Sequence, residues 1–304
     1  MKKIAILGGS HFIGVHLFLA LLQQGHQLTL YNRNISLPPV PYPEGIEIIK
    51  GDRNKPEDLK RLFQQKFDVV FDLSGYTPRH VQPIIDNYQE NIEHYIFCST
   101  PIAYKIPTPN PYNEEAPRTF EENTYGGDKA LVEELLFNQY SISGWPVTIF
   151  RPQGIFGPYD TWQAGFVYYS LIHSLPIFVF EESKYRMNPL FVDDLITAFL
   201  NAIENPISYG SAYGVAGNDV VSNLEFIELC EKITSYHPCL NNVVPPYSIK
   251  DFQIGYSWLE YDTVADCSMI ISELGMKFTP LETALEKTFL WLDDNPIHME
   301  RYSL

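Results

Sequence analysis

The sequence predicts an α/β fold, in which a doubly wound parallel sheet is followed by a smaller C-terminal lobe. Over the first 150 residues, short runs rich in β-branched and aromatic residues alternate with longer helical patterns. Several of the short runs are almost continuously apolar, which is typical of parallel strands covered on both faces. Because such alternation builds right-handed βαβ units, we expect helices on both sides of the sheet.

The individual elements follow from this pattern. Strands are predicted over residues 3–7, 28–32, 46–50, 68–73, 94–99 and 147–151, and helices over residues 12–24, 56–65, 79–88 and 125–140. The first helix stops at Gly25, a residue type common at helix ends. The second has Pro56 in its first turn, followed by Glu57 and Asp58, which favour the positive end of the helix dipole.

The alternation becomes less regular after Pro152. Helices are expected near 164–173, 192–204, 223–234, 264–274 and 281–293, with Asn223 as a cap and a strand over 212–216. We therefore assign residues 1–160 and about 187–217 to the sheet domain, and about 161–186 and 218–304 to a substrate-binding lobe. Trp162, Phe166, Tyr168 and Tyr169 are expected to be mostly core of that lobe, although stacking on a base or sugar is the alternative.

Composition narrows the classes of function. The chain has 304 residues with 21 basic and 37 acidic side chains, a net charge of −16. A field of this sign repels nucleic acid and anionic membranes, so neither is an expected partner. The four cysteines lack the spacing of a metal site, and none is expected. No apolar stretch reaches membrane-spanning length and no signal cleavage site follows the first one, so a cytoplasmic location is expected.

A glycine-containing turn joins the first strand to the first helix. Gly8 allows a tight turn, Gly14 allows the helix to pack closely, and the N–H groups that open the helix can face a pyrophosphate. We therefore expect Ser10, Phe12 and Ile13 to border the phosphates of a dinucleotide in a Rossmann fold. An ordinary βα loop is the alternative, but the βαβ units that follow favour the nucleotide.

The turn LGGSHFIG resembles the TGGTGFIG turn of the extended short-chain dehydrogenase/reductase family, which contains the nucleotide-sugar epimerases. It differs at His11, where that family has its middle glycine. A related atypical branch, which includes the chloroplast stem-loop-binding proteins, has a basic residue there in a GGTRFIG turn. The resemblance implies that His11 lies at the rim of the turn and donates a hydrogen bond to a phosphate.

Residues after the second, third and fourth strands bear on the nucleotide's identity. NAD-binding folds have an acidic residue after strand two, whereas this chain has Asn32 and Arg33, which favour NADP over NAD as the cofactor. Arg33 as an ordinary surface cation is the alternative. The resemblance implies that Asp52 accepts from the adenine amino group, with Arg53 beside it, unless Asp52 caps the next helix. Gly75 matches a small-residue turn that lets the backbone approach the cofactor.

The segment TYGGDK carries the strongest chemical signal, because Tyr125 and Lys129 stand one helical turn apart. An ammonium beside a phenol is expected to lower the phenol pKa, so that Tyr125 can act as general acid and base, while Lys129 also holds the cofactor ribose. By resemblance to the family's SSxxVY segment, Thr100 orients the substrate, with Ser99 as its neighbour. A strand-end hydroxyl bonded to its own backbone is the alternative for Thr100.

Further segments extend the resemblance along nearly the whole chain. RPQGIFGP (151–158) is similar to the family's RPxNVYGP segment, which borders nicotinamide and substrate and includes Gln153. Arg186 lies where the family has a cation for the diphosphate of a nucleotide-sugar, or is a loop charge. The family's dehydratases have an acid pair after the threonine. This chain has Pro101-Ile102 there, so 4,6-dehydratase activity is not expected.

Together these features predict an NAD(P)-dependent epimerase or reductase acting on a hydroxyl or carbonyl carbon, with a small-molecule substrate such as a sugar nucleotide. The alternative is an inactive protein of the same fold that binds RNA or acts as a regulator, which the acidic charge disfavours. By resemblance, the helices near 79–92 and 125–140 would pair two chains into a homodimer.

Overall fold

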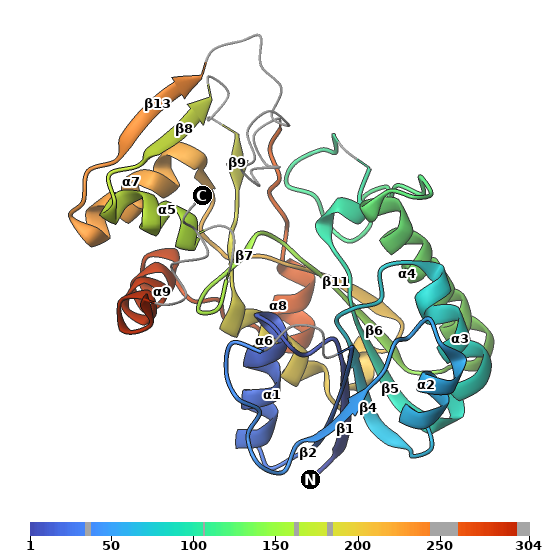
Figure 1. Ribbon diagram of the computed structural model, residues 1–304. Helices are drawn as coiled ribbons and strands as arrows, with labels where there is room; N and C mark the ends of the chain where they lie inside the picture. Colours follow the sequence, from blue (N-terminus) through green and yellow to red (C-terminus); the bar gives the residue numbers. More distant parts are fainter. Residues whose placement is uncertain (34–37, 106, 161–163, 181–184, 244–260, 297–304) are drawn as a thin grey trace.

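The computed structural model describes residues 1–33, 38–105, 107–160, 164–180, 185–243 and 261–296. A seven-stranded sheet of order β11-β6-β5-β4-β1-β2-β3 forms its centre, and every neighbouring pair in it is parallel (Figure 1). Its strands are β1 (Lys3–Leu7), β2 (Gln27–Asn32), β3 (Glu47–Lys50), β4 (Phe67–Asp72), β5 (Ile92–Cys98), β6 (Val147–Pro152) and β11 (Ser211–Val215). The chain order reverses between β1 and β4, so the doubly wound parallel sheet is confirmed.

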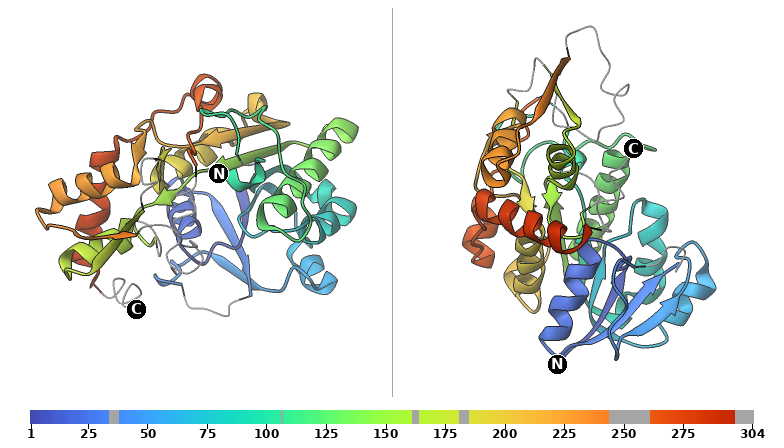
Figure 2. Two further views of the ribbon diagram at one scale, coloured as in Figure 1. Left: turned by 90° about the horizontal axis from the view of Figure 1, so that it is seen from above. Right: turned by 60° about the vertical axis from the view of Figure 1, so that its left-hand side comes forward.

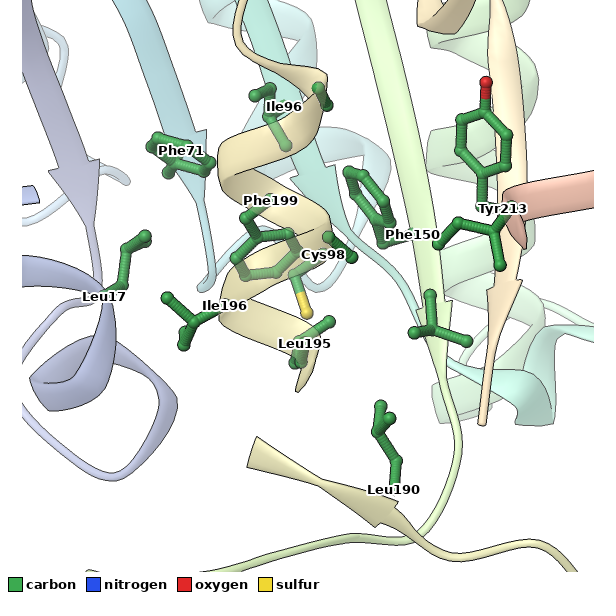
Figure 3. Close-up of a cluster of buried hydrophobic side chains, with 14 of the residues drawn as sticks. Leu17, Phe71, Ile96, Cys98, Phe150, Leu190, Leu195, Ile196, Phe199 and Tyr213 are labelled. Carbon is green, nitrogen blue, oxygen red and sulfur yellow. The ribbon is translucent and has the colours of Figure 1, made fainter. Parts of the chain in front are cut away.

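Helices cover both faces of the sheet. One face carries α1 (Ile13–Gln23), α6 (Val192–Ala202) and α8 (Ser268–Leu274), and the other carries α2 (Pro56–Leu62), α3 (Pro78–Tyr88) and α4 (Tyr125–Ser143) (Figure 1). On the first face the ring of Phe199 lies 5.6 Å from that of Phe71 and 5.1 Å from that of Phe150 (Figure 3). This packing joins α6 to the middle of the sheet and leaves the carboxyl ends of the strands open above it.

A smaller lobe lies beyond those carboxyl ends, as Figures 1 and 2 show from three directions. It contains α5 (Ala164–Ile172), α7 (Asn223–Thr234), α9 (Leu281–Asp294) and the parallel pair β8 (Pro176–Phe180) and β13 (Cys239–Val243). Two short ladders connect it to the sheet region: β7 (Ile155–Phe156) with β10 (Leu190–Phe191), and β9 (Arg186–Met187) with β12 (Val221–Ser222). The described segments also contain the single-turn helices η1 (Gln89–Asn91), η2 (Pro101–Ala103) and η3 (Pro206–Ser208).

The structure corrects several local expectations. Ser222 rather than Asn223 caps α7, because the Ser222 hydroxyl accepts from the Glu225 N–H and the Glu225 carboxylate accepts from the Ser222 N–H. The β8–β13 pair was not predicted as strands. Residues 265–278 were expected in the smaller lobe, but their buried side chains pack in the hydrophobic cluster of the sheet. The division of the chain into two domains stays a prediction.

The aromatic residues of the lobe mostly pack inward. Tyr168 is buried and stacks on Phe289 at 4.6 Å, and Phe166 and Tyr169 are half-buried against the same cluster. Trp162 lies outside the described residues. In the described part of the chain, no helix combines the length and apolar character needed to cross a lipid bilayer.

Candidate active site

The turn between β1 and α1 depends on three closely packed glycines. Gly8 has φ +95°, a conformation that favours glycine, and a Cβ there would lie 2.7 Å from the Cβ of Ser74. A Cβ on Gly14 would lie 2.4 Å from the Cα of Gly9, so α1 begins directly against the turn. Phe12 caps the helix at φ 38°, which is a strained conformation for a residue with a side chain. Gly14 thus allows close packing, as expected, and the segment against which it packs is the turn at Gly9.

A hollow of about 430 Å³, called here the turn cavity, opens beside this turn. It is lined by Gly8, Ser10, His11, Tyr31, Asn32, Arg33, Gly51, Asp52, Arg53, Asn54, Ser74, Tyr76 and His80. The buried Asn32 amide donates to the Tyr42 hydroxyl, which donates to Ser10 Oγ, at 3.3 Å in each case. His11 and Arg33 are exposed at its edge. The structure thus brings the glycine-containing turn and the residues at the ends of β2 and β3 around one hollow.

The Arg53 guanidinium forms an ion pair with a buried carboxylate of the protein. Its Nη1 and Nη2 donate to the two oxygens of the fully buried Asp72 at 2.9 and 2.6 Å, and Tyr95 donates to the same carboxylate. Burial favours the neutral acid, but the Arg53 guanidinium and these hydrogen bonds outweigh it and hold the pKa of Asp72 below its usual value. A Cβ on Gly75 would lie 2.7 Å from Asp72 Oδ2, so this glycine is required by packing.

The side chain of Asp52 has a local role. Its Oδ1 accepts from the N–H and the side-chain amide of Asn54, both at 3.0 Å, and these bonds lower the pKa of Asp52. Helix α2 begins after Lys55 without a side-chain cap, so Asp52 shapes the loop rather than capping that helix. Recognition of adenine by Asp52 stays a prediction.

A second and larger hollow of about 1000 Å³, the catalytic cavity, contains the predicted catalytic residues. Its lining includes Phe12, Ile13, Tyr76, Cys98, Ser99, Thr100, Tyr125, Lys129, Gln153 and Asp160. Gly126 explains why Tyr125 lies beside Thr100, since a Cβ on Gly126 would lie 2.1 Å from the carbonyl oxygen of Ile102. The close approach of α4 to η2 brings the Tyr125 phenol beside the Thr100 hydroxyl, which favours the phenolate and partly offsets the effect of burial on the Tyr125 pKa. The structure therefore brings all three predicted catalytic side chains together.

The Lys129 ammonium is held by a backbone carbonyl. Lys129 is 2% exposed, and its Nζ donates to the Cys98 carbonyl at 2.6 Å. The Nζ lies 4.6 Å from the ring centroid of Phe97 and 5.1 Å from that of Tyr76. Burial raises the pKa of Tyr125 to about 12, whereas the spacing of Tyr125 and Lys129 predicts that the ammonium lowers it. That expectation is wrong for this state, because desolvation dominates and the ammonium is held by Cys98.

The predicted substrate residues have structural partners. Ser99 Oγ donates to Glu133 at 2.5 Å, and the Gln153 side chain bonds to Tyr112, Thr263 and Asn188. Both Ser99 and Gln153 still line the catalytic cavity. Arg186 lines neither cavity: its half-exposed side chain donates to the Val220 carbonyl at 2.9 Å and lies 3.7 Å from Glu225.

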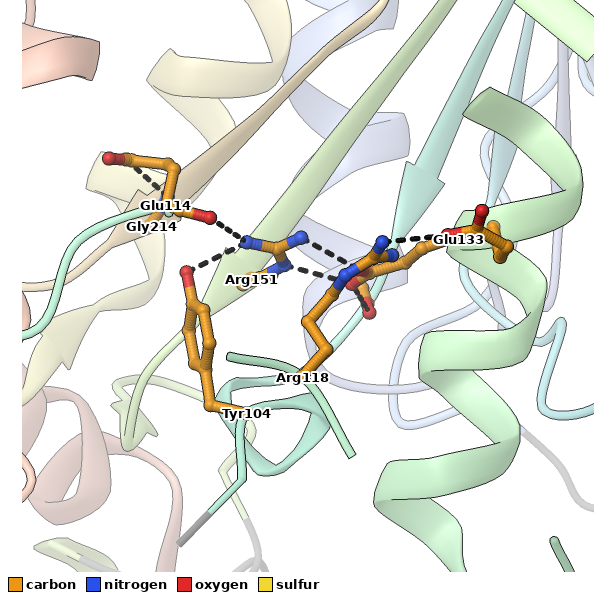
Figure 4. A network of polar contacts seen from close by, with 8 residues as sticks. Tyr104, Glu114, Arg118, Glu133, Arg151 and Gly214 are labelled. Carbon is orange, nitrogen blue, oxygen red and sulfur yellow. Dashed lines mark hydrogen bonds and ion pairs between the residues drawn. The ribbon is translucent and has the colours of Figure 1, made fainter. Parts of the chain in front are cut away.

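A buried charged network beside the site was not identified from sequence. Arg151 donates from Nε and Nη2 to the two oxygens of Glu133 at 2.9 and 2.7 Å, and from Nη1 to the Tyr104 hydroxyl at 2.8 Å (Figure 4). Arg118 reaches Glu133 from the other side at 3.3 Å. The sequence does indicate one member of the network, because Glu133 stands one helical turn after Lys129 and therefore on the same helix face. This network fixes α4 against β6 and the end of β5.

The two cavities adjoin each other, and the chemistry of their lining suits a dinucleotide. Tyr76 is the one lining residue that they share among the described residues, so they adjoin each other at its side chain. Near the turn cavity, the Tyr31 hydroxyl and Arg53 Nε are buried and have no hydrogen-bond partner. Exposed Arg33 and the backbone N–H groups of the turn suit phosphate groups. No cluster of three or more metal-ligating side chains occurs among the residues that the structure describes.

Comparisons with known proteins agree with this geometry. Residues 4–216 match the model of the NAD dependent epimerase/dehydratase family. The chain is 31% identical over 269 residues to the chloroplast stem-loop binding protein of 41 kDa b of Arabidopsis thaliana, covering 84% of this chain and 68% of that protein. It is 28% identical to a UDP-glucose 4-epimerase of Neisseria meningitidis, covering 55% of this chain and 56% of that enzyme.

Among solved structures, a dTDP-glucose 4,6-dehydratase from Bacillus anthracis in complex with NAD has a TM-score of 0.84 at 15% identity, with both chains covered completely. This likeness confirms the fold that the sequence predicts. The family match spans the turn, the segment that carries Tyr125 and Lys129, and β11. The chain therefore belongs to the NAD dependent epimerase/dehydratase family, the extended short-chain dehydrogenase/reductase group that its motifs resemble.

Proposed function

We propose that this protein is an NAD(P)-dependent enzyme that oxidises a hydroxyl or reduces a carbonyl group of a small molecule, as an epimerase or a reductase. One observation carries the proposal: Thr100, Tyr125 and Lys129 line a single cavity that adjoins the turn cavity at Tyr76. A binding protein without chemistry has no need of a phenol and a hydroxyl side by side in the lining of such a cavity.

The protein's own groups account for the proton transfer. With the pKa of Tyr125 near 12, its phenol is protonated at neutral pH and can donate a proton to a substrate oxygen that Thr100 also contacts. When bound, the nicotinamide supplies or accepts the hydride. In the opposite direction Tyr125 must first lose its proton to solvent, so that the phenolate can accept the proton of the substrate hydroxyl. The phenolate becomes more favourable if the Lys129 ammonium leaves the Cys98 carbonyl and approaches it.

We further propose NADP rather than NAD as the cofactor. The turn from Gly8 to Gly14 would hold the pyrophosphate, and Lys129 would hold the ribose beside the nicotinamide. Arg33 and His11, both exposed at the edge of the turn cavity, suit a 2′-phosphate. The related structures carry NAD, so the preference for NADP rests on these residues of this chain.

A sugar nucleotide is our first candidate for the substrate, because relatives include UDP-glucose 4-epimerases. Arg186 lines neither cavity, so binding of a diphosphate there would require other residues. Relatives also include dTDP-D-glucose 4,6-dehydratases, so the family leaves that activity open. We propose against it, because Pro101 and Ile102 line the cavity after Thr100 and neither can donate a proton.

RNA binding is the second candidate, favoured by the relative named a chloroplast stem-loop binding protein. The net charge of −16 opposes it, since phosphate backbones are bound by clustered lysine and arginine. RNA affinity measured at two salt concentrations separates the candidates, because a true site loses affinity steeply with salt. Pairing of α3 and α4 into a homodimer stays a prediction.

The proposed enzyme is tested with Tyr125→Phe. Native mass spectrometry and NADPH fluorescence should show dinucleotide binding by the wild type and the variant alike. Turnover of a panel that includes UDP-glucose and dTDP-glucose should fall by about 10²- to 10⁴-fold in the variant. Tyr140→Phe, on the same helix and outside both cavities, is the control. A wild type that binds neither NADP(H) nor NAD(H) contradicts the proposal.

A further inference from the structure

We propose that Tyr76 is a gate between the two cavities: its ring must move away from Lys129 before a dinucleotide can occupy both. This inference rests on the proposed function, since it concerns how the cofactor enters. Tyr76 belongs to the lining of the turn cavity and of the catalytic cavity, and no other described lining residue belongs to both.

The two cavities lie along one seam between the turn and the segment after β4. From the turn, Ser10 and His11 line the turn cavity, whereas Phe12 and Ile13 line the catalytic cavity. From the other side, Ser74 lines the first and Leu73 lines the second. A ligand that follows the seam from one cavity to the other therefore has to pass the Tyr76 side chain.

The contacts of Tyr76 leave its ring able to move while its backbone stays fixed. Its N–H donates to His80 Nδ1 at 3.2 Å, and the preceding Gly75 is packed so tightly that a Cβ would meet Asp72 and Phe97. The side chain is 47% exposed, although it follows a buried strand. Its ring lies near two other rings and an ammonium: Tyr125 at 6.2 Å, His80 at 6.4 Å and the Lys129 Nζ at 5.1 Å.

Movement of the ring would change the surroundings of Lys129. In the observed state, one N–H of the ammonium donates to the Cys98 carbonyl, and the group lies near the faces of Phe97 and Tyr76. An ammonium has three donors, so loss of the Tyr76 face leaves donors for a ribose hydroxyl and for the Tyr125 phenol. Opening of the gate by the cofactor would thus also complete the arrangement of Tyr125 and Lys129, which the observed state lacks.

Binding kinetics test the gate. NADPH association and dissociation are followed by its own fluorescence in a stopped-flow instrument for the wild type, Tyr76→Ala and Tyr76→Phe. Association slows when binding requires a conformational change, so we expect Tyr76→Ala to associate about tenfold faster than the wild type. Tyr76→Phe keeps the ring and should match the wild type. Tyr236→Ala, a similarly exposed tyrosine outside both cavities, is the control and should also match it.

The possible results are distinguishable. An unchanged association rate in Tyr76→Ala, with thermal unfolding that shows a folded protein, overturns the gate and leaves the proposed function standing. Equal acceleration in Tyr76→Phe also overturns it, because the hydroxyl and not the ring would then be the barrier. A wild type that does not bind NADPH or NADH at all overturns the proposed function together with the gate. Faster association in Tyr76→Ala alone supports the inference.

Discussion

Glu133 and Arg151 form a two-bonded ion pair inside the protein, at 2.9 and 2.7 Å, with the Glu133 side chain fully buried and that of Arg151 2% exposed. Glu133 also accepts from Ser99, the residue before Thr100. The pair thus connects the helix that carries Tyr125 and Lys129 to the two strands whose ends form the catalytic cavity. The positions of the candidate catalytic residues therefore depend on two charged side chains that do not line the cavity.

We predict that Arg151→Met lowers the free energy of unfolding by about 3–5 kcal/mol, because the Glu133 carboxylate is then buried without its main partner. Arg118→Met should cost only about 1 kcal/mol, since Arg118 is more exposed and shares its charge with the half-exposed Glu134. Urea unfolding of both variants measures the difference. Glu133→Leu combined with Arg151→Met should recover part of the loss, and equal losses in the two single variants would show that the pair is not the cause.

Cofactor preference gives a second prediction, for Arg33→Asp. A guanidinium pairs with a 2′-phosphate whereas a carboxylate repels it, so the wild type should bind NADP⁺ more tightly than NAD⁺ and the variant should reverse the order. We expect the affinity for NADP⁺ to fall by about 10- to 100-fold. Isothermal titration with both nucleotides measures this change. Lys66→Asp makes the same change of charge at an exposed residue outside both cavities and should leave the preference intact.

The sequence predicts those parts of the site that depend on local pattern. The apolar runs identify the parallel strands, and parallel strands bring Thr100 at the end of β5 and the turn after β1 to the same edge of the sheet. Gly126 and Gly127 in TYGGDK permit the close packing that brings Tyr125 to Thr100. These features rely on chain neighbours and on the geometry that all doubly wound sheets share.

Other features depend on contacts between distant segments, which no local pattern reveals. The sequence pattern predicts Arg53 as a cofactor residue, but its charge is balanced by Asp72, which ends β4 and lies 19 residues away in the chain. The direction of the Lys129 ammonium depends on the Cys98 carbonyl and on the rings of Phe97 and Tyr76. Helical spacing brings Lys129 and Tyr125 to one face of the helix, but it does not determine which acceptor the ammonium binds.

The hydrogen bonds of His94 lead to a prediction about acid stability. Its side chain is 2% exposed, and Nε2 lies 2.9 Å from Thr148 Oγ1. Because Thr148 donates to the Ser208 carbonyl, His94 Nε2 acts as the donor to Thr148, and Nδ1 has no hydrogen-bond partner. Protonation of Nδ1 would bury a charged donor without an acceptor. Burial accordingly lowers the pKa of His94 to about 4.

The unfolded chain binds a proton at His94 near pH 6.5, whereas the folded chain binds it only near pH 4. Above about pH 6.5 His94 is neutral in both states and does not reduce the free energy of unfolding. As the pH drops from 6.5 toward 4, protonation of His94 in the unfolded chain lowers the free energy of unfolding by about 3 kcal/mol in total. In urea unfolding between pH 4.5 and 7.5, His94→Leu should flatten that dependence, because the titrating group is gone. His237→Leu, at a side chain 90% exposed, should keep the wild-type slope. Identical slopes in the wild type and His94→Leu would assign acid sensitivity to other groups, such as the partly buried His26 and His80, whose pKa values burial also lowers.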